Sequence, residues 1–153
     1  MCTIQIIYHS QTGNTQKMAE CAAKGAGSIA GVTVILKKAD EATLQDLLVC
    51  NGLIIGTPEY FGYMSGIIKD FFDRTYAQAR DKNQVSKKPY AVFISAGNDG
   101  TGALNSIERI CTGFQFKKTC SPLIAKGAID NAIAAKCEEL GATIAAGCKE
   151  KIY

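Results

Sequence analysis

The sequence predicts an α/β fold of three layers, in which helices cover both faces of an open, doubly wound parallel sheet. Three observations predict it: short apolar runs alternate with segments of helical periodicity, the runs have the length and composition of buried strands, and polar, glycine-rich segments follow three of them. The chain has 153 residues and no internal repeat or linker-like stretch, so we expect residues 1–153 to form a single domain.

The first elements are predicted from residue type and spacing. Residues 3–8 (TIQIIY) are rich in β-branched side chains and form a first strand. Apolar side chains recur at helical spacing over residues 15–29, and Gly31 follows as a stop, so this segment is a helix. A second strand covers residues 32–36, and the leucines of residues 44–49 support a short helix.

The middle of the chain continues the alternation. Residues 53–56 are continuously apolar, as is typical of a strand buried in a parallel sheet. Residues 67–76 place apolar side chains on one side of a helix, and residues 78–88 are polar enough to be an exposed connection. Pro89 then introduces a fourth strand over residues 90–95.

The last third of the chain completes the pattern. Residues 104–110 are helical, residues 123–126 form a weak fifth strand, and residues 129–148 form a long, alanine-rich closing helix. Five strands therefore alternate with five helices. Ligands of such sheets bind beyond the carboxyl ends of the strands, where the winding reverses, so we expect the function to lie in the loops after the first, third and fourth strands.

Composition and charge exclude several classes of function. The net charge is only +3, with its excess in residues 81–153, and the lysine pairs are scattered and not interleaved with aromatic residues, so we expect no nucleic-acid binding. The longest apolar run is far shorter than the ~20 residues of a membrane span, and no basic leader precedes the first strand. Seven cysteines without metal-binding spacing indicate a protein of a reducing cytoplasm.

Hydroxyl and amide side chains gather after the first strand, where the first helix begins. The loop is His9-Ser10-Gln11-Thr12-Gly13-Asn14-Thr15. A helix N-terminus offers unpaired N–H groups and the positive end of the helix dipole, Gly13 permits close approach of the backbone, and three hydroxyls add donors. The loop is therefore predicted to bind a phosphate. The alternative is an ordinary helix N-cap with a polar turn.

This loop differs from other phosphate-binding motifs. A triphosphate-binding loop requires G-x-x-x-x-G-K-[ST], whose lysine and second glycine are missing. A formal G-x-G-x-x-A runs from Gly25 to Ala30, but it follows a helix and precedes a strand, the reverse of the dinucleotide motif. The third strand ends in Gly56-Thr57-Pro58 and not in an aspartate, which argues against a phospho-acceptor role.

The other two loops are predicted to hold a planar ligand. The segment from Thr57 to Gly66 carries three aromatic side chains that can stack on a ring. The segment from Ser95 to Gly102 is small and glycine-rich, so its backbone can approach the edge of a ring. Each has a plainer alternative, core aromatics for the first and turn chemistry for the second. Their convergence with the phosphate loop favours one ligand site.

These residues resemble a known family. The run from Ser10 to Thr15 (SQTGNT) resembles the phosphate-binding loop of flavodoxins, S/T-x-T-G-x-T, which grips the phosphate of FMN. The run from Gly56 to Gly62 (GTPEYFG), with the helical residues 68–73 (IKDFFD), resembles NAD(P)H-dependent FMN reductases and related flavin quinone reductases. The resemblance spans nearly the whole chain and implies a flavodoxin-like fold with a five-stranded parallel sheet in the order 2-1-3-4-5.

The resemblance implies FMN as the cofactor and three groups of residues that bind it. The phosphate would be held by Ser10, Gln11, Thr12, Gly13, Asn14 and Thr15. The isoalloxazine ring would be flanked by Pro58, Glu59, Tyr60, Phe61 and Gly62. Its other edge would be contacted by Ser95, Ala96, Gly97 and Asn98. No metal and no catalytic side chain are implied, since the flavin itself carries the chemistry.

The function implied is that of an FMN flavoprotein that acts in electron transfer or as a small NAD(P)H-dependent oxidoreductase of the FMN- or quinone-reductase type. Its expected partners are FMN, NAD(P)H or redox proteins, and it is expected to be a monomer or homodimer. The chain is basic and lacks Trp, unlike acidic electron-carrying flavodoxins, and it is too short for the segments with which larger quinone reductases build tetramers. A flavin-free interaction module on the same fold is the alternative from a different class.

Three residues of these loops carry more specific expectations. Gly62 is the expected peptide that reorients when the flavin is reduced. Glu59 is expected to lower the reduction potential through its charge, with a solvent-facing carboxylate as the alternative. His9, the single histidine, is expected only to flank the phosphate loop.

Overall fold

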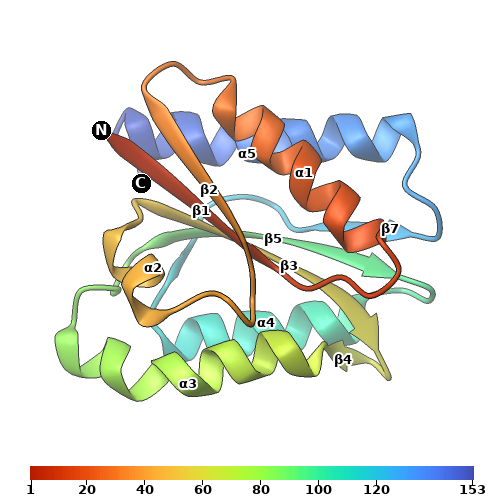
Figure 1. The fold of residues 1–153 in the computed structure, drawn as a ribbon, viewed down its shortest axis with the longest axis horizontal. Helices are drawn as coiled ribbons and strands as arrows, with labels where there is room; N and C mark the ends of the chain where they lie inside the picture. The colour runs from red at the N-terminus through yellow and green to blue at the C-terminus, as the bar shows by residue number, and fades with distance from the viewer.

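A sheet lies between two layers of helices in the computed structural model, which describes residues 1–153 (Figure 1). Helices α1 (Asn14–Gly27) and α5 (Asn131–Lys149) cover one face of the sheet. Helices α2 (Leu44–Val49), α3 (Gly66–Lys82) and α4 (Thr101–Gly113) cover the other face. The three-layer α/β architecture predicted from the sequence is confirmed.

Five parallel strands make up the body of the sheet. They are β1 (Cys2–Tyr8), β2 (Val32–Lys38), β3 (Gly52–Tyr60), β5 (Pro89–Ala96) and β7 (Leu123–Lys126). Strand β1 lies between β2 and β3, and β5 lies between β3 and β7, which confirms the predicted order 2-1-3-4-5. The central strands are buried on both faces by helices, and for this reason their sequences are apolar almost without interruption.

The complete sheet has seven strands and not the predicted five, and it is not wholly parallel. Strand β4 (Tyr63–Met64) folds back antiparallel on the end of β3, and β6 (Lys117–Lys118) runs parallel to the start of β5. Each is two residues long, which is too short for the side-chain alternation that marks a strand in a sequence. Strand β4 bears on the site because it turns the end of β3 into a hairpin.

Helix α3 is longer than predicted. The sequence predicts a helix over residues 67–76 and an exposed connection over residues 78–88, whereas α3 continues to Lys82. Four of the five residues 78–82 are good helix formers, Asp81 being the exception, and Ala79 is fully buried. The helix ends at Asn83, whose φ of 49° is left-handed. The polar side chains of this stretch therefore belong to the exposed face of a helix.

Hydrophobic cores on the two faces of the sheet hold the layers together. One contains 21 buried residues beneath α2, α3 and α4, and the other contains 17 beneath α1 and α5. Helices α1 and α5 also approach each other backbone to backbone. A Cβ built on Gly25 would lie 1.9 Å from the carbonyl oxygen of Glu138, and one on Gly141 would lie 2.0 Å from that of Ala22. Only glycine fits at these two positions.

Both ends of the chain lie at one edge of the sheet, opposite to the carboxyl ends of the parallel strands (Figure 1). At the C-terminus, the ring of Tyr153 occupies the place that a side chain on Gly147 of α5 would take. None of the helices has the length and apolar character that crossing a membrane requires.

Candidate functional site

The three predicted loops leave the sheet side by side. Tyr8 of β1 pairs with Gly56 of β3, and Pro58 of β3 pairs with Ser95 of β5, so the carboxyl ends of these strands are neighbours. The segments that follow them, residues 9–13, 59–62 and 97–100, make up a surface that we call the loop edge. Doubly wound sheets bind their ligands at this position.

The first segment of the loop edge leads into an open helix N-terminus. Gly13 is the N-cap residue of α1 and has a left-handed φ of 106°. Its N–H donates to the Ser10 hydroxyl over 3.1 Å, which closes the loop. No side chain caps the helix, and its first turn holds no acidic residue. The N–H groups of Asn14, Thr15 and Gln16 thus have no partner within the helix.

Two threonine hydroxyls lie beside these N–H groups in the sequence. Thr12 is exposed in the loop, whereas Thr15 is 2% exposed in the first turn of α1. Neither hydroxyl makes a hydrogen bond within the chain, unlike that of Ser10. Uncapped N–H groups and free hydroxyls at the positive end of a helix dipole form a surface that suits an anion.

Helix α4 also begins at the loop edge, but the protein itself occupies its N-terminus. Its N-cap residue is the left-handed Gly100, with φ of 76°. The Asp99 carboxylate accepts a hydrogen bond from the Thr101 N–H at 2.9 Å, and Glu59 accepts from the N–H groups of Gly100 at 3.3 Å and Ala103 at 3.2 Å. Of the two helices, α1 therefore offers free N–H groups to an anionic ligand.

Hydrogen bonds from α4 also determine the charge of the loop edge. Backbone and side-chain hydrogen bonds from Thr101 lower the pKa of Asp99, so this carboxylate is ionised at neutral pH. The loop edge contains no lysine or arginine. A bound anion would thus be stabilised by α1 and by hydroxyl groups, and not by a cationic side chain of these loops.

The second segment is a hairpin with an exposed aromatic tip, which we call the aromatic hairpin (residues 59–64). Tyr60 pairs with Tyr63, so β3 and β4 are joined by the two-residue turn Phe61-Gly62. Both turn residues have positive φ, 52° and 71°, as a type I′ turn requires. For Phe61 this conformation costs about 1–2 kcal/mol, yet its ring is fully exposed, at 108%. Such a ring contributes nothing to the core and is available to a ligand.

His9 brings the first and second segments together. Its ring meets that of Tyr60 edge-on, with 6.4 Å between the centroids and 77° between the planes. Burial lowers the pKa of His9, so the imidazole is neutral at pH 7. The sequence predicts only that His9 flanks the phosphate loop. Its contact with the aromatic hairpin depends on tertiary structure, and no local pattern indicates it.

The third segment is only partly a loop. Ser95 and Ala96 are the last residues of β5 and are buried, whereas Gly97 and Asn98 are exposed. Pro58 is likewise buried within β3. Of the residues predicted to flank a planar ligand, these three strand residues lie beneath the surface, and a ligand above them would meet Gly97 and Asn98 directly.

Glycines mark where the loop edge is open and where it is tightly packed. A Cβ built on Gly13, Gly62 or Gly97 would meet no atom within 4 Å, and these glycines come from the three different segments. A Cβ on Gly102 of α4 would instead lie 2.1 Å from the carbonyl oxygen of Gly62. The Gly62 carbonyl of the aromatic hairpin is thus packed closely against α4. Open space remains where a side chain on Gly13, Gly62 or Gly97 would lie.

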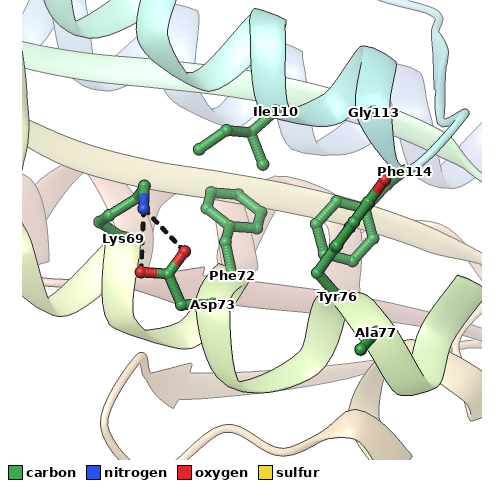
Figure 2. Close-up of a pocket in the computed structure, with 8 residues that line it drawn as sticks. All are labelled: Lys69, Phe72, Asp73, Tyr76, Ala77, Ile110, Gly113 and Phe114. Atoms are coloured by element: carbon green, nitrogen blue, oxygen red, sulfur yellow. Dashed lines mark hydrogen bonds and ion pairs between the residues drawn. The ribbon is translucent and has the colours of Figure 1, made fainter.

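A separate hollow lies between α3 and α4. The hollow has a volume of about 390 Å³. Figure 2 shows its lining: Phe72 and Tyr76 of α3, Ile110 of α4, and Phe114, whose ring contacts both aromatic rings of α3. The ion pair of Lys69 and Asp73 (2.7 Å) lies at one end. A second hollow of about 470 Å³ shares Lys69 and Ile110 with it and continues to Tyr63 of the aromatic hairpin. No sequence pattern indicates either hollow, and of the aromatic residues predicted to stack on a ligand only Tyr63 lines the second hollow.

Comparison with known proteins identifies the family. The family model for flavodoxins matches residues 6–142. The chain belongs to the flavodoxin family. The family resemblance drawn from the sequence is therefore confirmed, and proteins of this family bind FMN as a rule.

Individual relatives of this flavodoxin-family chain agree with the assignment. A flavodoxin of Aquifex aeolicus is 40% identical over 119 residues, which cover 76% of this chain and 63% of the relative. An NAD(P)H dehydrogenase (quinone) of Acidithiobacillus ferrooxidans is 31% identical over 122 residues, which cover 67% of this chain and 60% of the relative. The chain thus spans less than two thirds of the length of either protein.

A solved structure shows the same fold. The structure of a flavodoxin from the domain Archaea superimposes with a TM-score of 0.82 at 23% identity, over 96% of this chain and 99% of that protein. The loop edge combines free N–H groups and hydroxyls, which suit an anion, with the exposed Phe61 ring beside open glycines, which suits a flat ring system.

Proposed function

We propose that the chain binds FMN at the loop edge and acts as an electron-transferring flavoprotein. The observation that carries this proposal is the uncapped N-terminus of α1, which begins at a left-handed glycine between free threonine hydroxyls, at the same edge as an exposed and strained aromatic tip. Membership of the flavodoxin family makes FMN the ligand that both features fit.

In this proposal each segment has one task. The N–H groups of Asn14 and Thr15 and the hydroxyls of the first loop bind the phosphate dianion, aided by the dipole of α1. Tyr60 and Phe61 pack against one side of the ring, and Gly97 and Asn98 approach its other edge with backbone groups. FMN, when bound, supplies the redox chemistry. The protein sets its orientation and its exposure to solvent.

Two sources of electrons are open to such a site. A carrier exchanges single electrons with redox proteins, whereas a reductase takes hydride from NAD(P)H. The match to an NAD(P)H dehydrogenase (quinone) favours the reductase as the second candidate function. Seven free thiols suit action in a reducing cytoplasm, where we place the protein as a monomer or homodimer. Burial raises the pKa of Cys137 and Cys148 to about 12, so these two thiols stay protonated at neutral pH.

The first prediction concerns the cofactor itself. Apoprotein titrated with FMN should quench the fluorescence of the flavin and melt at a higher temperature. At a free FMN concentration of 100 times Kd, binding adds about 2.7 kcal/mol of stability, which for a chain of this size corresponds to about 5–10 °C in Tm. A melting temperature indifferent to FMN, with no flavin absorption bands in the purified protein, contradicts the proposal and favours a flavin-free interaction module.

Anaerobic addition of NADH or NADPH to the FMN-loaded protein separates the two candidates. Rapid bleaching of the flavin bands supports the reductase. An unchanged spectrum, followed by bleaching with dithionite, supports the carrier, because it shows that the flavin can be reduced but does not accept hydride from these donors.

A further inference from the structure

Glu59 joins the aromatic hairpin to helix α4. Its side chain leaves the end of β3, and its two carboxylate oxygens accept hydrogen bonds from two different N–H groups of α4, those of Gly100 at 3.3 Å and Ala103 at 3.2 Å. The residue is partly buried at this junction. Because the N-cap residue of α4 is a glycine, no side chain of its own could cap these groups.

Two other contacts at the same junction join the backbone of the aromatic hairpin to small residues of α4. The Gly62 carbonyl packs against Gly102, and the Met64 N–H donates to the Ser106 hydroxyl at 3.2 Å. Glu59 is the charged member of this set, and it contacts the first turn of the helix. Its hydrogen bonds are charge-assisted, and they place a negative charge at the positive end of α4.

The aromatic hairpin needs such an anchor. Phe61 is left-handed and fully exposed, so neither its own conformation nor burial in the core stabilises the turn. A two-residue strand adds few hydrogen bonds of its own. The contacts with α4 therefore decide where the rings of Tyr60 and Phe61 lie relative to Gly97 and Asn98, which stand in the short segment between β5 and α4.

We propose that Glu59 is a positioning residue: by capping α4 it orders the aromatic hairpin before the ligand arrives. The inference rests on the proposed FMN site, and it assigns Glu59 a task different from the electrostatic one expected from sequence. The carboxylate faces the N–H groups of α4, so its charge is compensated there. The conformational entropy of the aromatic hairpin is thus lost during folding and not during binding of the ligand.

The test compares Glu59→Gln and Glu59→Ala with Glu139→Gln, which removes one exposed carboxylate on α5, at the opposite face of the sheet. In the apoprotein, hydrogen exchange of the Gly100 and Ala103 amides should accelerate about five- to thirtyfold in Glu59→Ala, as expected for loss of a helix cap, and less in Glu59→Gln, which retains one acceptor. Glu139→Gln should exchange like the wild type.

Ligand binding then separates positioning of the ring from binding of the phosphate. Glu59→Ala should weaken FMN and riboflavin, which lacks the phosphate, by the same factor of about five to thirty. At saturating FMN the visible circular dichroism of the flavin should also change, since the ring then lies in a less ordered environment. Glu59→Gln should restore part of both effects.

Several outcomes would overturn the inference. One is unchanged affinity and circular dichroism in Glu59→Ala, and another is weakening of FMN without weakening of riboflavin. A third is a raised midpoint potential in Glu59→Gln with normal amide exchange, because the carboxylate would then act on the flavin through its charge. If the wild type binds no flavin, the proposed function fails, while amide exchange still tests the contact with α4. Should Glu59→Ala not fold, Glu59→Gln provides the same comparisons.

Discussion

At the scale of single residues, the hydroxyls of Thr12 and Thr15 distinguish a phosphate-binding loop from an ordinary helix cap. Both hydroxyls lack partners in the chain, so neither is needed to satisfy the backbone. Replacing each by the isosteric valine should leave stability nearly unchanged and weaken FMN by about 1–3 kcal/mol per hydroxyl, since a phosphate oxygen loses its donor. Titration of apoprotein, followed by flavin fluorescence, measures this change.

Two controls make this prediction specific. Thr112→Val, at an exposed position near the end of α4, should bind FMN like the wild type. Riboflavin should bind equally to the wild type and to the Thr12 and Thr15 variants, because it has no phosphate. Equal FMN affinity in all these proteins would place the phosphate elsewhere than at α1.

At the scale of elements, the contact between α1 and α5 depends on glycine. Alanine in place of Gly25 gains about 1 kcal/mol of helix propensity, but its Cβ would lie 1.9 Å from the Glu138 carbonyl oxygen and must push the helices apart. We expect Gly25→Ala to lower the free energy of unfolding by about 1–3 kcal/mol net, as measured by urea denaturation.

Gly27 provides the matched control on the same helix. A Cβ there would come no closer than 3.9 Å to its nearest neighbour, a methyl group of Val34. Gly27→Ala should therefore be neutral or stabilising by up to about 1 kcal/mol. If Gly25→Ala is as stable as Gly27→Ala, the close approach of α1 and α5 is not a feature of the protein in solution.

The elements also show what a sequence can and cannot indicate. The three central strands β1, β3 and β5 were predictable because their buried residues form nearly continuous apolar runs, and the first loop because hydroxyls, amides and Gly13 cluster before a helix. Strands β4 and β6 are too short for a periodic signal. The contact of Glu59 with Ala103 could not be predicted either, since it arises only when β3 and α4 meet in the folded chain.

At the scale of the whole molecule, the pH dependence of stability should carry the signature of one histidine. Burial lowers the pKa of His9 below its ordinary value of about 6.5, so the unfolded chain takes up this proton first on acidification. Stability should be complete above about pH 6.5 and fall as the pH drops towards the folded pKa. Urea denaturation across this range measures the effect.

His9→Gln should abolish this loss, because the chain has no other histidine. A second loss is expected at lower pH. Burial alone would raise the pKa of Asp46, but hydrogen bonds from Lys37 and Thr43 outweigh it and lower the pKa. The stability that the ionised Asp46 contributes is therefore lost only below about pH 4. A His9→Gln variant that loses stability like the wild type just below about pH 6.5 contradicts the assignment.

The placement of the two chain ends has a practical consequence. Residues 1 and 153 lie at the edge of the sheet opposite to the loop edge (Figure 1). A molecule attached to an electrode through either terminus would therefore turn the proposed flavin site away from the conductor and towards the solution. Such a film would serve diffusing reactants well and exchange electrons poorly with the electrode. Direct electrical contact would require an anchor on the aromatic hairpin or beside it.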